Sequence, residues 1–132
     1  MAPSDPPNPL PEFIYKIHLP AEDFNYKLSD FDRVSGFIHL SVWEQVFKTA
    51  DRFFANDTSL VIQRIQIDKL KAKGGNLEWE YVDGAIFPHW FFEPLDQALV
   101  GLGDVATWTR KSDVLWEGAF DGTSPPLAPE SR

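Results

Sequence analysis

The chain is 132 residues long, which is enough for one domain with a substantial hydrophobic core. Aromatic residues make up 14% of it, more than a small core needs, so we expect some rings to line a cleft or an interface. The net charge of −8 and the scattered basic residues argue against unaided binding to nucleic acid or to an anionic membrane. The absence of cysteine excludes disulfides and thiolate chemistry, and no apolar run or signal peptide suggests a membrane or export route. A soluble, cytoplasmic protein is therefore expected.

Proline-rich segments lie at both ends of the chain. Residues 1–12 contain five prolines and show no apolar periodicity, and residues 121–132 have a similar composition. Such segments have few amide donors and little apolar surface to bury. We therefore expect a disordered segment over 1–12, a single globular domain over 13–120 and a flexible tail over 121–132.

Within the domain, β-branched and aromatic runs alternate with turn residues. They predict strands over 13–17, 36–40, 60–67, 77–82 and 86–92, with a ring-bearing loop over 21–32. Residues 105–110 and 114–116 are candidates for additional short strands. The dipeptide Asp83-Gly84 is a hairpin turn signal, and Pro88 favours an edge position or a bulge in its strand.

The main predicted helix follows the second strand. Ser41 and Glu44 are spaced as in a capping box, and apolar residues then recur every three or four positions. Five or six short strands against one main helix indicate an α+β fold built on a compact, mostly antiparallel β-sheet.

A histidine lies in the middle of the second predicted strand. The period of two places Phe37, His39 and Ser41 on one face and the aliphatic Ile38 and Leu40 on the other, which we expect to face the core. His39 then faces a cleft or a second layer. The alternative is a core histidine with both ring nitrogens hydrogen-bonded. The Ser41 hydroxyl likewise has two possible roles, as the cap of the following helix or as a group that takes part in catalysis.

A second histidine lies among rings. His89 follows Pro88 and is flanked by Phe87 and Trp90, which would hold the imidazole stiffly, as a site residue requires. The alternative is a bulge at Pro88 that turns His89 toward solvent. We expect His39 and His89 to converge on one cleft, with Phe37, Trp79, Phe87 and Trp90 as ligand-binding rings.

Charged candidates are fewer. Glu78 and Glu80 share one face of a strand, so they are either solvated or turned into the cleft, where Glu80 would serve as a catalytic carboxylate. Arg33 either receives an anionic group or forms a surface ion pair. No pair of histidines has metal-ligand spacing, so no metal is expected.

Six segments together carry a family resemblance. They read I-Y-K-I, D-R-V-S-G-F-I-H-L-S, Q-V-F-K-T-A-D-R-F-F, L-V-I-Q-R-I-Q-I-D, L-E-W-E and F-P-H-W. Over residues 13–100 this order resembles the domain of unknown function 952 family. The resemblance implies a fold like that of the ADP-ribosyltransferases and RNA 2′-phosphotransferases, in which two small sheets clasp NAD in a cleft. It places Tyr15, His39, Ser41, Glu80 and His89 at that cleft.

Three functions follow from these observations. The resemblance implies an enzyme that binds or acts on NAD or a related nucleotide, with His39, His89 and Glu80 as catalytic residues. The aromatic content and the lack of an arginine near the second histidine favour an acid–base or cyclisation enzyme that acts on a non-nucleotide organic molecule. The third is a ligand-binding module without turnover. In each case the partner is a small molecule, and the oligomeric state is left open.

Overall fold

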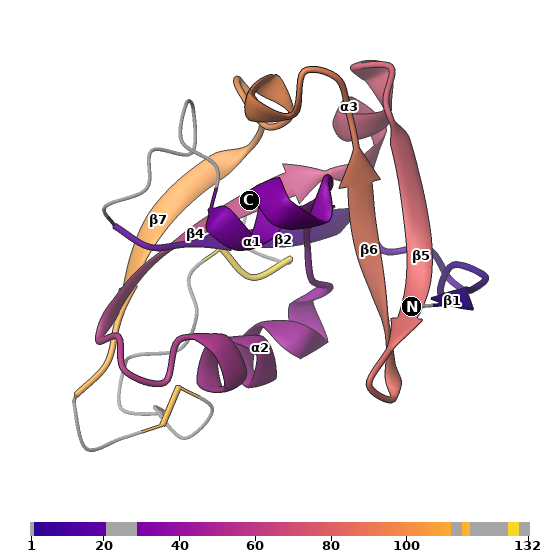
Figure 1. Ribbon diagram of the computed structural model, residues 1–132. Coiled ribbons are helices and arrows are strands. Elements are labelled where there is room, and N and C mark those ends of the chain that lie inside the picture. The colour runs from indigo at the N-terminus through magenta and orange to yellow at the C-terminus, as the bar shows by residue number, and fades with distance from the viewer. Residues whose placement is uncertain (1, 21–28, 112–114, 117–126, 130–132) are drawn as a thin grey trace.

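The computed structural model describes residues 2–20, 29–111, 115–116 and 127–129. These residues form two antiparallel sheets with short helices between the strands (Figure 1). The elements are β1 (Ala2–Pro3), β2 (Phe13–His18), α1 (Asp30–Ser35), β3 (Ile38–His39), the 3₁₀ turn η1 (Trp43–Gln45), α2 (Val46–Phe53), β4 (Ser59–Gln66), α3 (Ile67–Ala72), β5 (Asn76–Val82), β6 (Ala85–Phe91), the 3₁₀ turn η2 (Leu95–Gln97) and β7 (Asp104–Thr109). The predicted α+β class with antiparallel sheets is confirmed.

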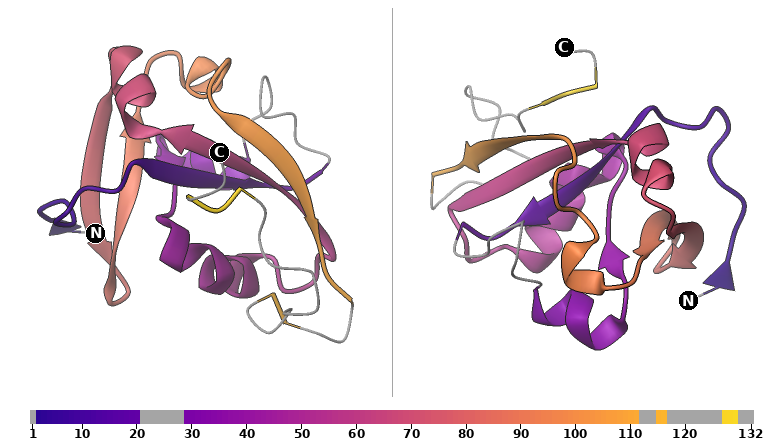
Figure 2. Two further views of the ribbon diagram at one scale, coloured as in Figure 1. Left: turned by 180° about the vertical axis from the view of Figure 1, so that it is seen from behind. Right: turned by 90° about the horizontal axis from the view of Figure 1, so that it is seen from above.

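One sheet has four strands and the other has three. One has the strand order β1-β5-β6-β3 and the other the order β2-β4-β7. Their strands run across one another, so that β5 and β6 stand nearly upright in Figure 1 while β2 and β4 cross the view. Figure 2 shows from behind how β1 and β5 form the outer edge of the first sheet.

Alternation along β2 supplies two hydrophobic cores, one on each face of the three-stranded sheet. Ile14 belongs to the cluster shared with the four-stranded sheet, which includes the buried Trp79 and Trp90. Tyr15 and Ile17 belong to the cluster beneath α2, together with Trp108. Both faces of β2 and β4 are largely buried, whereas β7 is mostly exposed.

The hairpin between β5 and β6 fixes the face on which the site lies. Asp83 and Gly84 have φ angles of 50° and 89°, which are the conformations that a two-residue hairpin loop requires and that the sequence predicted. Val82 therefore pairs with Ala85, and the register continues to Glu78 opposite His89.

Pro88 does not mark an edge or a bulge, contrary to expectation. The strand β6 is continuous and lies between β5 and β3. The Pro88 carbonyl accepts a hydrogen bond from the Leu40 amide, so the proline nitrogen also faces the β3 side. Since β3 ends at His39, no ladder bond on that side requires the missing N–H group.

Ser41 does not cap a helix. Its amide and carbonyl exchange backbone hydrogen bonds with Tyr15, which keeps the chain extended through Ser41. The turn η1 begins two residues later, where the Gln45 side chain accepts from the Val42 amide. The helix α2 itself starts only at Val46. The capping-box spacing was thus outweighed by pairing with a strand of the other sheet.

Other segments differ from expectation as well. Residues 2–3, expected to be disordered, pair with β5, and the loop expected over 21–32 ends in α1. Ile67–Ala72 forms the helix α3 where the strand was expected to end. Of the candidate strand over 114–116, residue 114 lies outside the described residues and the other two are not in a strand. Within the part of the tail that the structure describes, the Leu127 carbonyl accepts from the Tyr15 hydroxyl.

Candidate functional site

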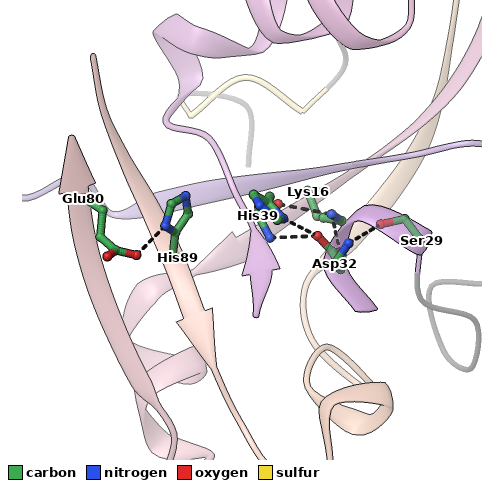
Figure 3. Close-up of polar contacts among 6 residues, drawn as sticks. All are labelled: Lys16, Ser29, Asp32, His39, Glu80 and His89. Atoms are coloured by element: carbon green, nitrogen blue, oxygen red, sulfur yellow. Dashed lines mark hydrogen bonds and ion pairs between the residues drawn. The ribbon is translucent and has the colours of Figure 1, made fainter. Parts of the chain in front are cut away.

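Five polar side chains lie in a row across the edge where the two sheets meet (Figure 3). Glu80 comes from β5, His89 from β6, His39 from β3, Asp32 from α1 and Lys16 from β2. Each is joined to a neighbour in the row by a hydrogen bond or an aromatic contact. Residues from five separate elements thus build one connected group.

The turn between α1 and β3 brings Asp32 back to His39. Ser29 caps α1 by accepting a hydrogen bond from the Asp32 amide, and Gly36 ends the helix with a φ of 83°. A left-handed residue at this position reverses the chain direction with little strain only if it is glycine. The chain then returns along the helix, so that His39 lies beside a residue seven positions earlier.

Asp32 is a buried carboxylate that accepts three hydrogen bonds. One oxygen accepts from the backbone amide of His39 at 3.0 Å and from its Nδ1 at 2.6 Å, and the other accepts from Nζ of Lys16 at 2.6 Å. Burial alone would raise the pKa of Asp32. The charge of Lys16 and the bonds from His39 outweigh it and lower the pKa from 3.8 to about 2. Asp32 therefore remains ionised throughout the neutral range.

Lys16 connects the two sheets at this point. It belongs to β2 of the three-stranded sheet, yet its Nζ also donates to the His39 carbonyl at 3.2 Å. The side chains of Lys16 and Asp32 are only 9% and 1% exposed. A buried pair of this kind is costly to break because the remaining charge would be left without compensation.

His89 has its own carboxylate. Its Nδ1 lies 2.6 Å from Oε1 of Glu80, which belongs to the neighbouring strand. Burial lowers the pKa of His89, the Glu80 bond opposes that effect, and the proximity of His39 lowers the pKa further. The net direction is downward, so His89 is mainly neutral at pH 7.

The two imidazoles meet edge to face. Their ring centroids are 5.3 Å apart with the planes inclined at 68°. In both rings Nδ1 lies 2.6 Å from a carboxylate oxygen that serves as the acceptor, so the proton is assigned to Nδ1. The Nε2 atom of each ring makes no hydrogen bond to any described residue. The side chain of His39 is 21% exposed, whereas that of His89 is only 3% exposed.

Aromatic rings hold the imidazoles in place. Phe37 lies 4.6 Å from the ring of His39 and 4.4 Å from that of His89, and it also contacts Phe91. On the other side, Phe31 stacks on His39 at 3.9 Å with an inclination of 16°. His39 is therefore fixed between two rings, although 21% of its side chain remains exposed.

The structure brings some of the predicted site residues together. His39, His89, Glu80 and Phe37 are in direct contact as described above. Phe87 lies two positions from His89 along β6, so it is on the same face, where it is half-buried. Glu78 shares this face too, but it is exposed and accepts a hydrogen bond from Asn76.

Other predicted residues lie elsewhere. Trp79 and Trp90 point to the opposite face of the sheet and are buried in its core, because they occupy the alternate positions of β5 and β6. Tyr15 is buried beneath α2, and the Ser41 hydroxyl lies 3.4 Å from that of Thr49. Arg33 is exposed and pairs with Asp30. These five do not line the surface around the two histidines.

Three participants were missed in the sequence. Lys16 and Asp32 lie in segments where a charged residue is unremarkable, and Phe31 was assigned to a loop. The only local signal was the spacing of Asp32 and His39 around Gly36, since a left-handed glycine after a short helix returns the chain. Lys16 gave no signal, because its contact depends on the packing of the two sheets.

Among the described residues, no cluster of three or more histidine and acidic side chains is arranged to hold a metal ion. None of the helices in the described part of the chain is long and apolar enough to cross a membrane.

Comparison with known proteins identifies the family. The family described as "Protein of unknown function (DUF952)" matches residues 19–101. The chain belongs to the DUF952 family. The crystal structure of protein CC0527 from Caulobacter crescentus is similar at a TM-score of 0.59 and 29% identity, covering 78% of this chain and 91% of that one. A double methionine mutant of the same protein matches equally well in fold, at 28% identity. No curated protein matches this DUF952 chain.

Proposed function

We propose that this DUF952 protein is an enzyme that moves protons on a small organic substrate between Nε2 of His39 and Nε2 of His89. One observation carries the proposal: two imidazoles in contact each present Nδ1 to a separate carboxylate and leave Nε2 without a described partner. Structural histidines in a core are usually hydrogen-bonded at both nitrogens, whereas acid–base catalysts keep one nitrogen for the substrate.

The two histidines have different roles in this proposal. His89 is the base, because its lowered pKa leaves the Nε2 lone pair free at neutral pH. His39 is the acid, because its bond from Nδ1 to Asp32 holds the ring and leaves Nε2 without a described partner. His89 takes one proton from the substrate and His39 gives one proton to it. His89 then releases its proton to solvent and His39 takes one from solvent, which resets the pair.

A metabolite screen tests the proposal across many candidate substrates at once. Wild-type protein and the His39→Gln and His89→Gln variants are incubated with a small-molecule extract, and mass spectrometry records which compounds are consumed. We expect at least one compound that the wild type converts and that each variant converts about 10² to 10⁴ times more slowly. Its rate should depend on pH as a bell-shaped curve that loses one limb in each variant. Equal conversion by wild type and both variants would contradict the proposal.

Nucleotide chemistry is the second candidate. The Glu80 carboxylate beside His89 is suited to stabilise positive charge at a ribose carbon, and two small sheets are what the ADP-ribosyltransferase resemblance implies. This candidate predicts that millimolar NAD or ADP-ribose raises the melting temperature with increasing concentration. A melting temperature that does not respond to either ligand would remove it.

A further inference from the structure

The row of polar residues continues into an exposed pair of aromatic rings. Phe31 of α1 and Phe53 of α2 lie 5.8 Å apart and are inclined at 32°, and we call them the exposed ring pair. They are 55% and 53% exposed, although the inner neighbour of Phe31 is the stacked ring of His39. The apolar surface of two phenylalanines therefore faces solvent immediately beside the proposed acid.

The charges around this surface are unfavourable for an anion. Lys16 pairs with Asp32, Arg33 pairs with Asp30, and Arg52, which lies over the Phe53 ring, pairs with Asp83. These three cations are therefore already engaged by carboxylates rather than left to bind a phosphate or carboxylate group of a ligand.

From these two observations we infer that the substrate is a planar aromatic molecule without anionic groups, neutral or cationic, whose ring packs on Phe31 and Phe53. The Phe31 ring lies between such a ligand and the face of His39, so the ligand would meet His39 at the exposed 21% of its side chain. A positive charge on the ligand is favoured by the neighbouring carboxylates and by the faces of the two phenylalanine rings. The inference rests on the proposed proton transfer only for the statement that this ligand is the substrate.

Three indole compounds separate the effect of the ring from that of the charge. Indole is neutral, tryptamine is cationic and indole-3-acetate is anionic, and ADP-ribose serves as an anionic nucleotide. Binding is followed by NMR at the ring protons of the chain's three histidines, assigned by single His→Gln substitutions. We expect saturable shifts of the His39 signal with indole and tryptamine, and tryptamine to bind about tenfold or more tightly than indole-3-acetate.

Two variants and one control locate the site. Phe31→Leu and Phe53→Leu each retain apolar bulk but lose the ring, and each should weaken tryptamine binding by about threefold to tenfold. The control is Val34→Ala, which changes a side chain of the same helix that is 87% exposed. It should bind tryptamine as the wild type does.

Several outcomes would overturn the inference. These are no saturable shift with indole or tryptamine, indole-3-acetate or ADP-ribose binding as tightly as tryptamine, or Phe→Leu variants that behave like Val34→Ala. A consumed substrate without an aromatic ring, found in the metabolite screen, would also overturn it while leaving the proton-transfer proposal intact. Conversely, if the indole probes bind as expected but no compound is consumed, the ring site stands and the proton-transfer proposal fails.

Discussion

The substitution Asp32→Asn tests whether the buried carboxylate of Asp32 stabilises the fold more than an exposed surface carboxylate does. The pKa of Asp32 falls from 3.8 to about 2 on folding, and each pKa unit corresponds to 1.36 kcal/mol. The ionised form therefore contributes about 2 kcal/mol to the free energy of unfolding. Because the folded pKa is the lower one, this contribution is complete above pH 3.8 and is lost as the pH falls toward 2.

The amide variant should cost more than this figure at pH 7. Asparagine keeps the size of the side chain but leaves the buried Lys16 ammonium without a counter-charge, and removing one member of such a pair typically costs about 3–5 kcal/mol. Urea unfolding followed by tryptophan fluorescence should show a midpoint lower by more than about 1 M with an unchanged slope. In addition, the loss of stability between pH 4 and pH 2 should become shallower.

Matched variants make the result interpretable. Asp30→Asn alters a carboxylate of the same helix that is 95% exposed, and it should leave the urea midpoint essentially unchanged. The double variant Lys16→Met/Asp32→Asn should recover part of the loss, because the uncompensated charge is gone. The reasoning is refuted if Asp32→Asn and Asp30→Asn are equally stable, or if the double variant is less stable than the sum of its single variants implies.

Three further predictions concern the site and its support. Because folding lowers the pKa of His89, its neutral state contributes stability above pH 6.5 that is lost as the pH falls. The urea midpoint of His89→Gln should therefore depend less on pH in this range. An unchanged pH profile would contradict the assignment. Gly36→Ala should cost about 1–2 kcal/mol in urea unfolding because φ is 83°, and it should also shift the NMR signal of His39, so a stable variant with a wild-type spectrum would count against the proposed turn. Gly75→Ala should destabilise the protein more than Gly36→Ala, since an added Cβ would lie 2.5 Å from the Phe91 carbonyl oxygen and 2.6 Å from the Trp90 ring. Thermal unfolding compares the two variants. A lower melting temperature for Gly36→Ala would contradict the described packing around Gly75.

Much of the local structure is encoded locally. The period of two separated Ile38 and Leu40 from His39, and the structure has both aliphatic residues in the core and the histidine on the other face. The turn at Asp83 and Gly84 fixed the register of the β5–β6 hairpin, and with it the side of the sheet that His89 and Glu80 share. These features depend on backbone geometry over a few residues, so they can be predicted without a partner segment.

Contacts between distant segments decided the conformation of Ser41 and the positions of two tryptophans, which local sequence patterns did not predict correctly. Ser41 had the local pattern of a helix cap, but two backbone hydrogen bonds to Tyr15 hold it extended. Trp79 and Trp90 are aromatic and near the histidines in sequence, yet they face the core because sheet packing buries that face.

By itself the sequence determined the class of fold, most of the strands and the two histidines as a candidate pair. Only the tertiary structure decided that Lys16, from the other sheet, fixes the charge of Asp32 beside His39. The physical reason is that periodicity reports which face of an element a side chain occupies, whereas a contact between elements depends on how their faces are brought together. No spacing along the chain encodes that distance.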